Sequence, residues 1–134
     1  MRTQADKGAA AVELAMVLPV LLLLVFGIID FGRMLNAQIS VTEAAREGAR
    51  AAVVDSTSST AAQDRIDLIN SDYEVVAAES TTCASTSAPG DNALVVVEYD
   101  FTWVTPMGAL AAFFGGGPFG TVTIEGKGVM PCRA

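Results

Sequence analysis

The sequence predicts an α+β protein, in which one long N-terminal helix precedes a small domain built on an antiparallel sheet. Two observations support this. A mostly apolar stretch begins at Ala9, and helical spacing continues from it as far as Val53. Towards the C-terminus, residues 95–103 and 121–130 alternate between apolar and polar side chains, which is the period of a strand with one buried face. A sheet lying on the long helix would bury both apolar faces.

The N-terminal segment has the length of a membrane span only if it includes one acidic residue. Leu14–Ile29 contains 16 uncharged residues, about 24 Å of helix, whereas the hydrocarbon core of a bilayer is about 30 Å thick. Starting at Ala9 gives 21 residues and about 31 Å, but Glu13 then lies within the membrane or at its boundary. An ionised carboxylate in hydrocarbon costs a few kcal/mol and usually faces a partner. Glu13 is therefore the main candidate functional residue.

Three interpretations of this segment remain open. A secretory signal peptide would have a small-residue cleavage site after the apolar run, and residues 28–33 do not contain one. An uncleaved signal anchor would place Glu13 at the lipid headgroups. In the third interpretation the chain is cut between Gly8 and Ala9, so that the leader 1–8 is removed and Glu13 becomes the fifth residue of the mature protein. This arrangement resembles the processing site of type IV prepilins.

The second part of the helix, residues 31–53, has a charged face and a face of small residues. Glycine within a helix costs about 1 kcal/mol relative to alanine, so a close backbone contact would explain Gly48. The backbone that approaches this face belongs either to another subunit or to the chain's own C-terminal domain. The charged face carries Glu43, Arg46, Glu47 and Arg50, and the packing face carries Ala44, Ala45, Gly48 and Ala49.

The remaining chain, residues 54–134, is predicted to form a small exported α+β domain. Thr60 and Gln63 resemble a capping box that opens a short helix extending to Ile69. Residues 73–78 are expected to form a strand in addition to the two alternating segments.

A second short helix is predicted after Thr105 and Pro106, and Gly115–Pro118 would end it. Its apolar residues either dock on a partner subunit or the membrane surface, or belong to the core. The glycines do not form a phosphate-binding loop, because no Gly-Lys-Ser/Thr follows them. The apolar residues of this helix are Met107, Leu110, Ala111, Phe113 and Phe114.

Charge is distributed unevenly along the chain. Residues 54–134 carry three basic and ten acidic side chains, a net charge of −7, whereas residues 1–8 carry a net charge of +1. An acidic domain repels nucleic acid, so nucleic-acid binding is not expected. The basic residues before the span favour a cytoplasmic N-terminus, with the C-terminal domain outside the cytoplasm.

The two cysteines, Cys83 and Cys132, both follow the span. The chain has no histidine and no third cysteine, so a zinc site is not expected. The alternatives are a disulfide formed in an oxidising compartment and two buried thiols. A disulfide that closes a loop of about 50 residues would contribute about 4 kcal/mol on the chain-entropy model.

The sequence contains no recognisable catalytic or metal-binding motif. Histidine for general base catalysis is absent, and so is a Gly-x-Ser-x-Gly nucleophile motif. Asp64, Asp67 and Asp72 lack the spacing of a calcium-binding loop. We therefore expect no enzymatic activity, no metal, no cofactor and no small-molecule substrate.

Three stretches carry a family resemblance: Glu13-Leu14-Ala15 leading into Pro19, the string Phe26-Gly-Ile-Ile-Asp-Phe-Gly-Arg33, and the string Ala44-Ala-Arg-Glu-Gly-Ala-Arg50. Together they resemble the TadE-like pseudopilin family of the tight-adherence (Flp) pilus machinery. They cover roughly the first 53 residues, and the later match, from Val95 to Met130, is one of composition.

The resemblance implies a membrane-anchored pseudopilin or minor pilin, single-pass in the cytoplasmic membrane, that takes part in assembling a tight-adherence type IV pilus. Residues 9–53 would be its transmembrane and stalk helix, of the pilin-like kind. Its partners would be a prepilin peptidase, other pilin or pseudopilin subunits, and the membrane. After cleavage, the new amine of Ala9 would pair with Glu13 of an adjacent subunit. The alternatives are an uncleaved signal-anchored surface binding module and a membrane-tethered enzyme.

Overall fold

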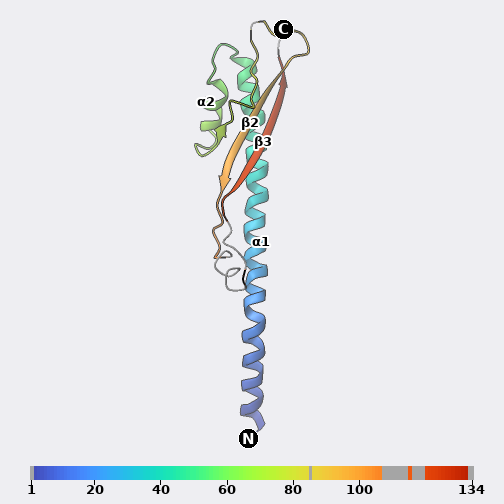
Figure 1. The fold of residues 1–134 in the computed structure, drawn as a ribbon, viewed down its shortest axis with the longest axis vertical. Coiled ribbons are helices and arrows are strands. Elements are labelled where there is room, and N and C mark those ends of the chain that lie inside the picture. The colour runs from blue at the N-terminus through green and yellow to red at the C-terminus, as the bar shows by residue number, and fades with distance from the viewer. Residues whose placement is uncertain (1, 85, 107–114, 116–119, 133–134) are drawn as a thin grey trace. The chain divides into compact units, whose positions relative to one another are not determined.

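The computed structural model describes residues 2–84, 86–106, 115 and 120–132, with only the backbone for residues 2–7. A long N-terminal helix and a small antiparallel sheet confirm the predicted α+β class (Figure 1). The apolar helix predicted at 107–114 lies outside the described residues. The elements in chain order are α1 (Arg2–Val54), α2 (Ala61–Asp67), β1 (Glu74–Val75), β2 (Asn92–Phe101) and β3 (Val122–Pro131).

The chain forms two compact units. The first consists of residues 1–33 and 102–120, and the second of residues 34–101 and 121–134. Helix α1 contributes its first part to one unit and its second part to the other. The second unit thus contains the whole sheet.

The sheet has the strand order β1-β2-β3, and both strand pairs are antiparallel. The β2–β3 ladder runs from Asn92 opposite Pro131 to Phe101 opposite Val122. The two alternating segments of the sequence are therefore strands, as predicted. The predicted end at Trp103 is wrong by two residues, because the last ladder pair forms at Phe101, opposite Val122.

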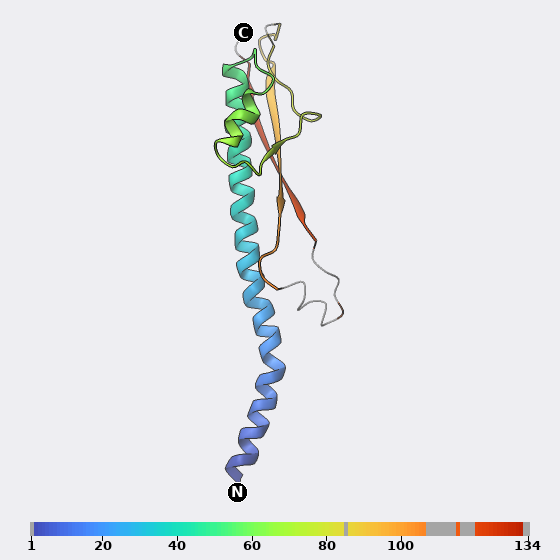
Figure 2. The ribbon, with the colours of Figure 1, turned by 90° about the vertical axis from the view of Figure 1, so that its left-hand side faces the viewer.

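In the second unit, β2 and β3 lie alongside the C-terminal part of α1 (Figures 1 and 2). The contact depends on glycines in β3. A Cβ atom built on Gly126 would lie 2.8 Å from the Val41 carbonyl oxygen, and one built on Gly128 would overlap the backbone of Ala45. The absence of a side chain at these two positions lets strand and helix backbones approach. The buried hydrophobic residues of this unit are Val41, Ala44, Ala45, Ala49, Ala52, Ala62, Ile66, Tyr73, Cys83, Ala93, Val95, Val96, Val97, Phe101 and Ile124.

Val96 departs from the predicted alternation. It was expected on the polar face of its strand, but it is as fully buried as Val95 and Val97. The segment after β1 hydrogen-bonds to its backbone: the N–H of Val76 donates to the Val96 carbonyl at 2.9 Å, and the Val96 N–H donates to the hydroxyl oxygen of Ser80 at 3.0 Å. These bonds hold the chain against β2 at this position.

Helix α2 forms where it was predicted, but the capping box does not. The Thr60 side chain makes no hydrogen bond to the helix backbone, and its hydroxyl donates to Asp64 at 3.0 Å instead. Gln63 reaches out of the helix: its amide donates to the carbonyl of Tyr73, and its amide oxygen accepts from the N–H of Val75. Because Gln63 attaches α2 to β1, it is unavailable to cap the helix.

Strand β1 is shorter than the predicted strand 73–78. It pairs with β2 only at Glu74 and Val75. The chain then turns, since the N–H groups of Glu79 and Ser80 both donate to the carbonyl of Val76. This turn ends the strand.

Candidate functional site

The predicted cleavage and pairing residues lie on the first part of α1. Gly8, Ala9 and Glu13 are all within the helix and all exposed. The helix begins at Arg2, so the predicted leader is helical too. A Cβ atom on Gly8 would meet no other atom within 4 Å. A larger residue at this position is therefore compatible with the folded chain.

Glu13 lies on a surface that is otherwise apolar. It shares this surface with Ala10, Leu14 and Val17, and the last two side chains are 63% and 54% exposed. Within the described part of the chain, Glu13 makes no ion pair. Its carboxylate is thus presented outward among apolar neighbours, where another molecule can approach it.

The first part of α1 has the properties of a membrane anchor. Among the described residues, the only helix long and apolar enough to cross a bilayer is the Gly8–Val54 part of α1. None of its most apolar window is buried, whereas the core helix of a soluble protein would be mostly covered. Exposed large apolar side chains extend from Val12 to Ile29. This surface matches the requirement of a helix that contacts lipid.

Asp30 directly follows the apolar run and is fully buried. It is the only buried charged side chain among the described residues. Its carboxylate accepts a hydrogen bond from the Thr105 hydroxyl and a longer one, 3.4 Å, from the Thr105 N–H. Arg33 donates to the other oxygen at 3.3 Å, one helical turn away. These donors compensate the carboxylate for the water that burial removes.

An aromatic contact lies next to the hydrogen bonds that Asp30 accepts from Thr105 and Arg33. The rings of Phe31 and Trp103 meet edge to face, with centroids 6.1 Å apart and planes at 74°. The indole N–H of Trp103 donates to the carbonyl of Gly120 at 2.8 Å. Residues 102–105 are therefore fixed to α1 by one polar and one aromatic contact.

Sequence reasoning did not identify Asp30 and Thr105 as a site. A carboxylate immediately after an apolar run, with arginine three residues later, was a visible signal. Its main donor, however, lies 75 residues away in the chain, and only folding brings the two together.

The structure places the small-residue face of α1 against the chain's own domain. Ala44, Ala45 and Ala49 are fully buried, and Gly48 is buried as well. A Cβ atom on Gly48 would lie 2.6 Å from the Ile66 side chain and 3.4 Å from that of Val95. The expected partner of this face was either another subunit or the chain's own C-terminal domain. The structure shows the second, with α2 and the sheet covering the face.

Cys83 and Cys132 form a disulfide, as predicted. Their Cα atoms are 5.7 Å apart, and 49 residues separate them in the sequence. The bond ties the loop before β2 to the residue after β3, and the Cys132 N–H also donates to the carbonyl of Asp91 at 2.8 Å. It closes the end of the sheet that holds the start of β2 and the end of β3.

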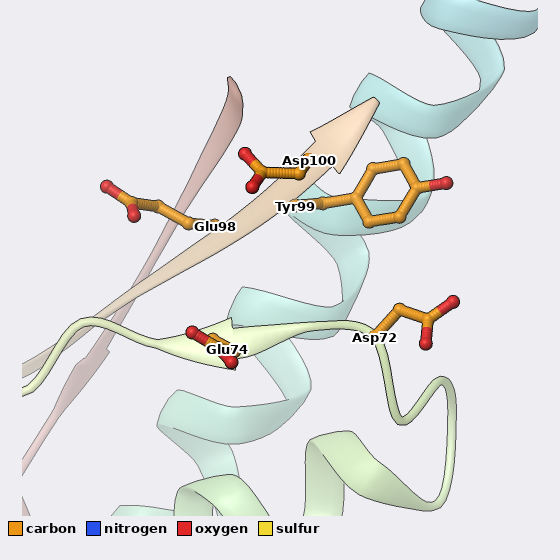
Figure 3. Close-up of a pocket in the computed structure, with 5 residues that line it drawn as sticks. All are labelled: Asp72, Glu74, Glu98, Tyr99 and Asp100. Carbon is orange, nitrogen blue, oxygen red and sulfur yellow. The ribbon is translucent and has the colours of Figure 1, made fainter. Parts of the chain in front are cut away.

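A surface hollow in the second unit is strongly acidic (Figure 3). It is lined by Asp72, Glu74, Glu98 and Asp100 together with Tyr99. Glu74 and Glu98 are directly opposite each other in the β1–β2 ladder, an arrangement that is unfavourable for like charges. Among the described residues no three His, Cys, Asp or Glu side chains are grouped so as to hold a metal ion. The hollow is therefore a charged surface of the domain.

Comparison with known proteins bears on the first part of the chain. No curated protein and no solved structure matches the chain. Residues 8–50 match the family model described as TadE-like protein. The match includes the three stretches that suggested this family, and it confirms the resemblance. Residues 8–50 of the chain are therefore similar to TadE-like proteins.

Proposed function

We propose that the chain is a pseudopilin or minor pilin that takes part in the assembly of a tight-adherence type IV pilus. The match to TadE-like proteins over residues 8–50 carries the proposal. The protein is anchored in the cytoplasmic membrane by the first part of α1, with the C-terminal domain outside the cytoplasm. It acts as a structural subunit without catalytic activity of its own, and its partners are other pilin or pseudopilin subunits, a prepilin peptidase and the membrane.

In this proposal, the peptidase hydrolyses the peptide bond between Gly8 and Ala9. Water adds across the bond, so that residues 1–8 leave with a new carboxylate and Ala9 gains a free ammonium group. The exposed Glu13 of an adjacent subunit then neutralises this ammonium group. In a low-dielectric surrounding, the pairing offsets part of the desolvation cost of both charges. It also fixes the register between neighbouring helices.

The cleavage step is tested by mass spectrometry of the protein from its native cell envelope. We expect the mature chain to begin at Ala9. Gly8→Leu should keep its leader. Because a larger side chain fits at this position, the loss of cleavage would not reflect misfolding. Gly32→Leu, at a glycine of α1 that is equally open, should be cut normally. Normal maturation of Gly8→Leu would contradict the cleavage site, and a native protein that retains Met1 would instead favour an uncleaved surface binding module.

The pairing step is tested by Glu13→Gln, which removes the charge and keeps the size of the side chain. We expect the variant to be cut at the same bond but to co-purify poorly with the pilus subunits. Glu43→Gln makes the same change at another exposed position of α1 and should co-purify normally. Equal recovery of both variants would remove the charge pairing from the proposal.

A further inference from the structure

The carboxyl end of the apolar run binds a second segment of the chain. Residues 102–106 return to α1 at this level, where Thr105 donates to the buried Asp30 and Trp103 contacts Phe31. Both contacts belong to the first compact unit, which also contains the whole apolar run. The position of residues 102–106 along the span is therefore fixed by the contacts that Asp30 and Phe31 make with Thr105 and Trp103.

The surface at this level is apolar and open. Val104, between the two residues that contact α1, is 70% exposed. Phe31 is 52% exposed, and Ile28, one turn earlier on the helix, is 66% exposed. The apolar surface of the anchor thus continues past its last residue, Ile29, onto residues 103 and 104.

We propose that residues 102–106 form a second membrane contact, in which Trp103 and Val104 lie at the boundary between lipid headgroups and acyl chains on the exported side. The inference rests on the membrane anchoring in the proposed function. A helix that enters the bilayer at Ala9 has crossed about 31 Å at Ile29, which matches a hydrocarbon core of about 30 Å. Phe31 and its ring partner Trp103 then reach the interface, where tryptophan is enriched in membrane proteins.

The burial of Asp30 fits this position. A carboxylate at the edge of the hydrocarbon loses part of its water, and its free energy rises unless protein donors replace that water. Thr105 supplies a hydroxyl and an N–H, and Arg33 supplies a guanidinium N–H. The Asp30–Thr105 contact therefore satisfies the carboxylate and at the same time holds Trp103 and Val104 at the membrane surface.

Lipid is favoured as the occupant over another protein because this patch continues the lipid-facing surface of the same helix. The preceding residues Ile28 and Ile29 are 66% and 48% exposed. The same lipid environment can therefore extend from these two residues to Phe31.

Trp103 is the only tryptophan of the chain, so its fluorescence reports this site alone. The full-length protein is reconstituted into phosphatidylcholine–phosphatidylglycerol vesicles whose acyl chains carry bromine near either the carboxyl end or the methyl end. We expect roughly a twofold loss of Trp103 emission with the shallow bromines, little loss with the deep ones, and protection from iodide added on both sides of the bilayer.

Two variants calibrate the depth. Trp103→Phe with Leu21→Trp places the tryptophan within the span, where deep bromines should quench it. Trp103→Phe with Phe31→Trp places it at the boundary on α1, where its quenching should resemble that of Trp103. If the Leu21→Trp reporter is not quenched by lipid, the anchoring itself fails. If it is quenched but Trp103 is not, the second membrane contact is overturned, and protection from iodide in that case would indicate a protein cover.

The role of Asp30 is tested with Thr105→Val, which removes the hydroxyl donor at nearly constant volume. We expect iodide to quench Trp103 more strongly in this variant and the lipid bromines to quench it less, while Thr105→Ser retains the parent behaviour. Unchanged quenching in Thr105→Val would refute the idea that the Asp30 contact positions the segment.

Discussion

The close approach of β3 to α1 makes the glycines of β3 sensitive to the smallest possible enlargement. A Cβ atom on Gly128 would lie 2.5 Å from the backbone N of Arg46 and nearer still to the carbonyl of Ala45. Ordinary contact of a Cβ atom begins at 3.4 Å, so the two backbones must separate by about 0.9 Å at Arg46 and by more at Ala45. No side-chain rotation can relieve this, because the obstructing atoms are helix backbone.

Overpacking a core typically costs about 1–3 kcal/mol, and a rigid obstruction places Gly128→Ala near the upper end, at about 3 kcal/mol. A domain of this size has a free energy of unfolding of about 5–15 kcal/mol, so the variant should still fold. Gly126→Ala, whose nearest obstruction is at 2.8 Å, should cost less. Gly120→Ala has no atom within 4 Å of the new methyl and should be neutral or slightly stabilising.

Hydrogen exchange of the β2 and β3 amides, followed by mass spectrometry on the full chain, measures these costs where they arise. For Gly128→Ala, a loss of about 3 kcal/mol corresponds to exchange that is roughly a hundredfold faster. Gly120→Ala is the matched control. Adding Ala45→Gly to Gly128→Ala should not restore protection, since it removes no backbone atom. Exchange at the parent rate in Gly128→Ala would refute the close packing of β3 on α1.

Two further predictions concern the second unit. Replacing both Cys83 and Cys132 by serine should lower the free energy of unfolding by about 4 kcal/mol on the chain-entropy model for a separation of 49 residues. Denaturant titration measures this loss, which reduction of the parent protein should reproduce, and a loss below about 1 kcal/mol would contradict that model. The Thr57 hydroxyl, followed by backbone N–H donors, lowers the pKa of Asp55 from 3.8. The stabilisation is therefore complete above that value and is lost as the pH falls through the lowered pKa of the folded state. Thermal unfolding at a series of pH values from about 2 to 5 should show a steeper acid loss in the parent than in Asp55→Asn, and identical slopes would exclude this contribution.

Local sequence patterns were sufficient to predict the main helices and strands and part of the candidate site. The alternation in residues 95–103 and 121–130 identified both long strands, because one buried face imposes a period of two. The small residues at 44–49 indicated a close backbone contact, which forms where Gly128 meets Ala45. At Gly48 the close neighbours are instead the side chains of Ile66 and Val95. The capping box failed because Thr60 and Gln63 have other partners in the fold, Asp64 and β1, which a local motif does not reveal. The carboxylates around Glu74 and Glu98 were not grouped in advance, since strand register brings them together.

The sequence by itself determined the features that depend on neighbours along the chain. These are the apolar helix, the acid at Glu13 within it, the TadE-like character of residues 8–50 and the period of the strands. Only the tertiary structure decided which surfaces meet. It joined Asp30 to Thr105 and placed Gly128 against Ala45, contacts that span 75 and 83 residues. The physical reason is that a buried charge and a strand backbone are satisfied by whatever folding brings within reach, and that choice depends on the packing of the whole unit rather than on any local pattern.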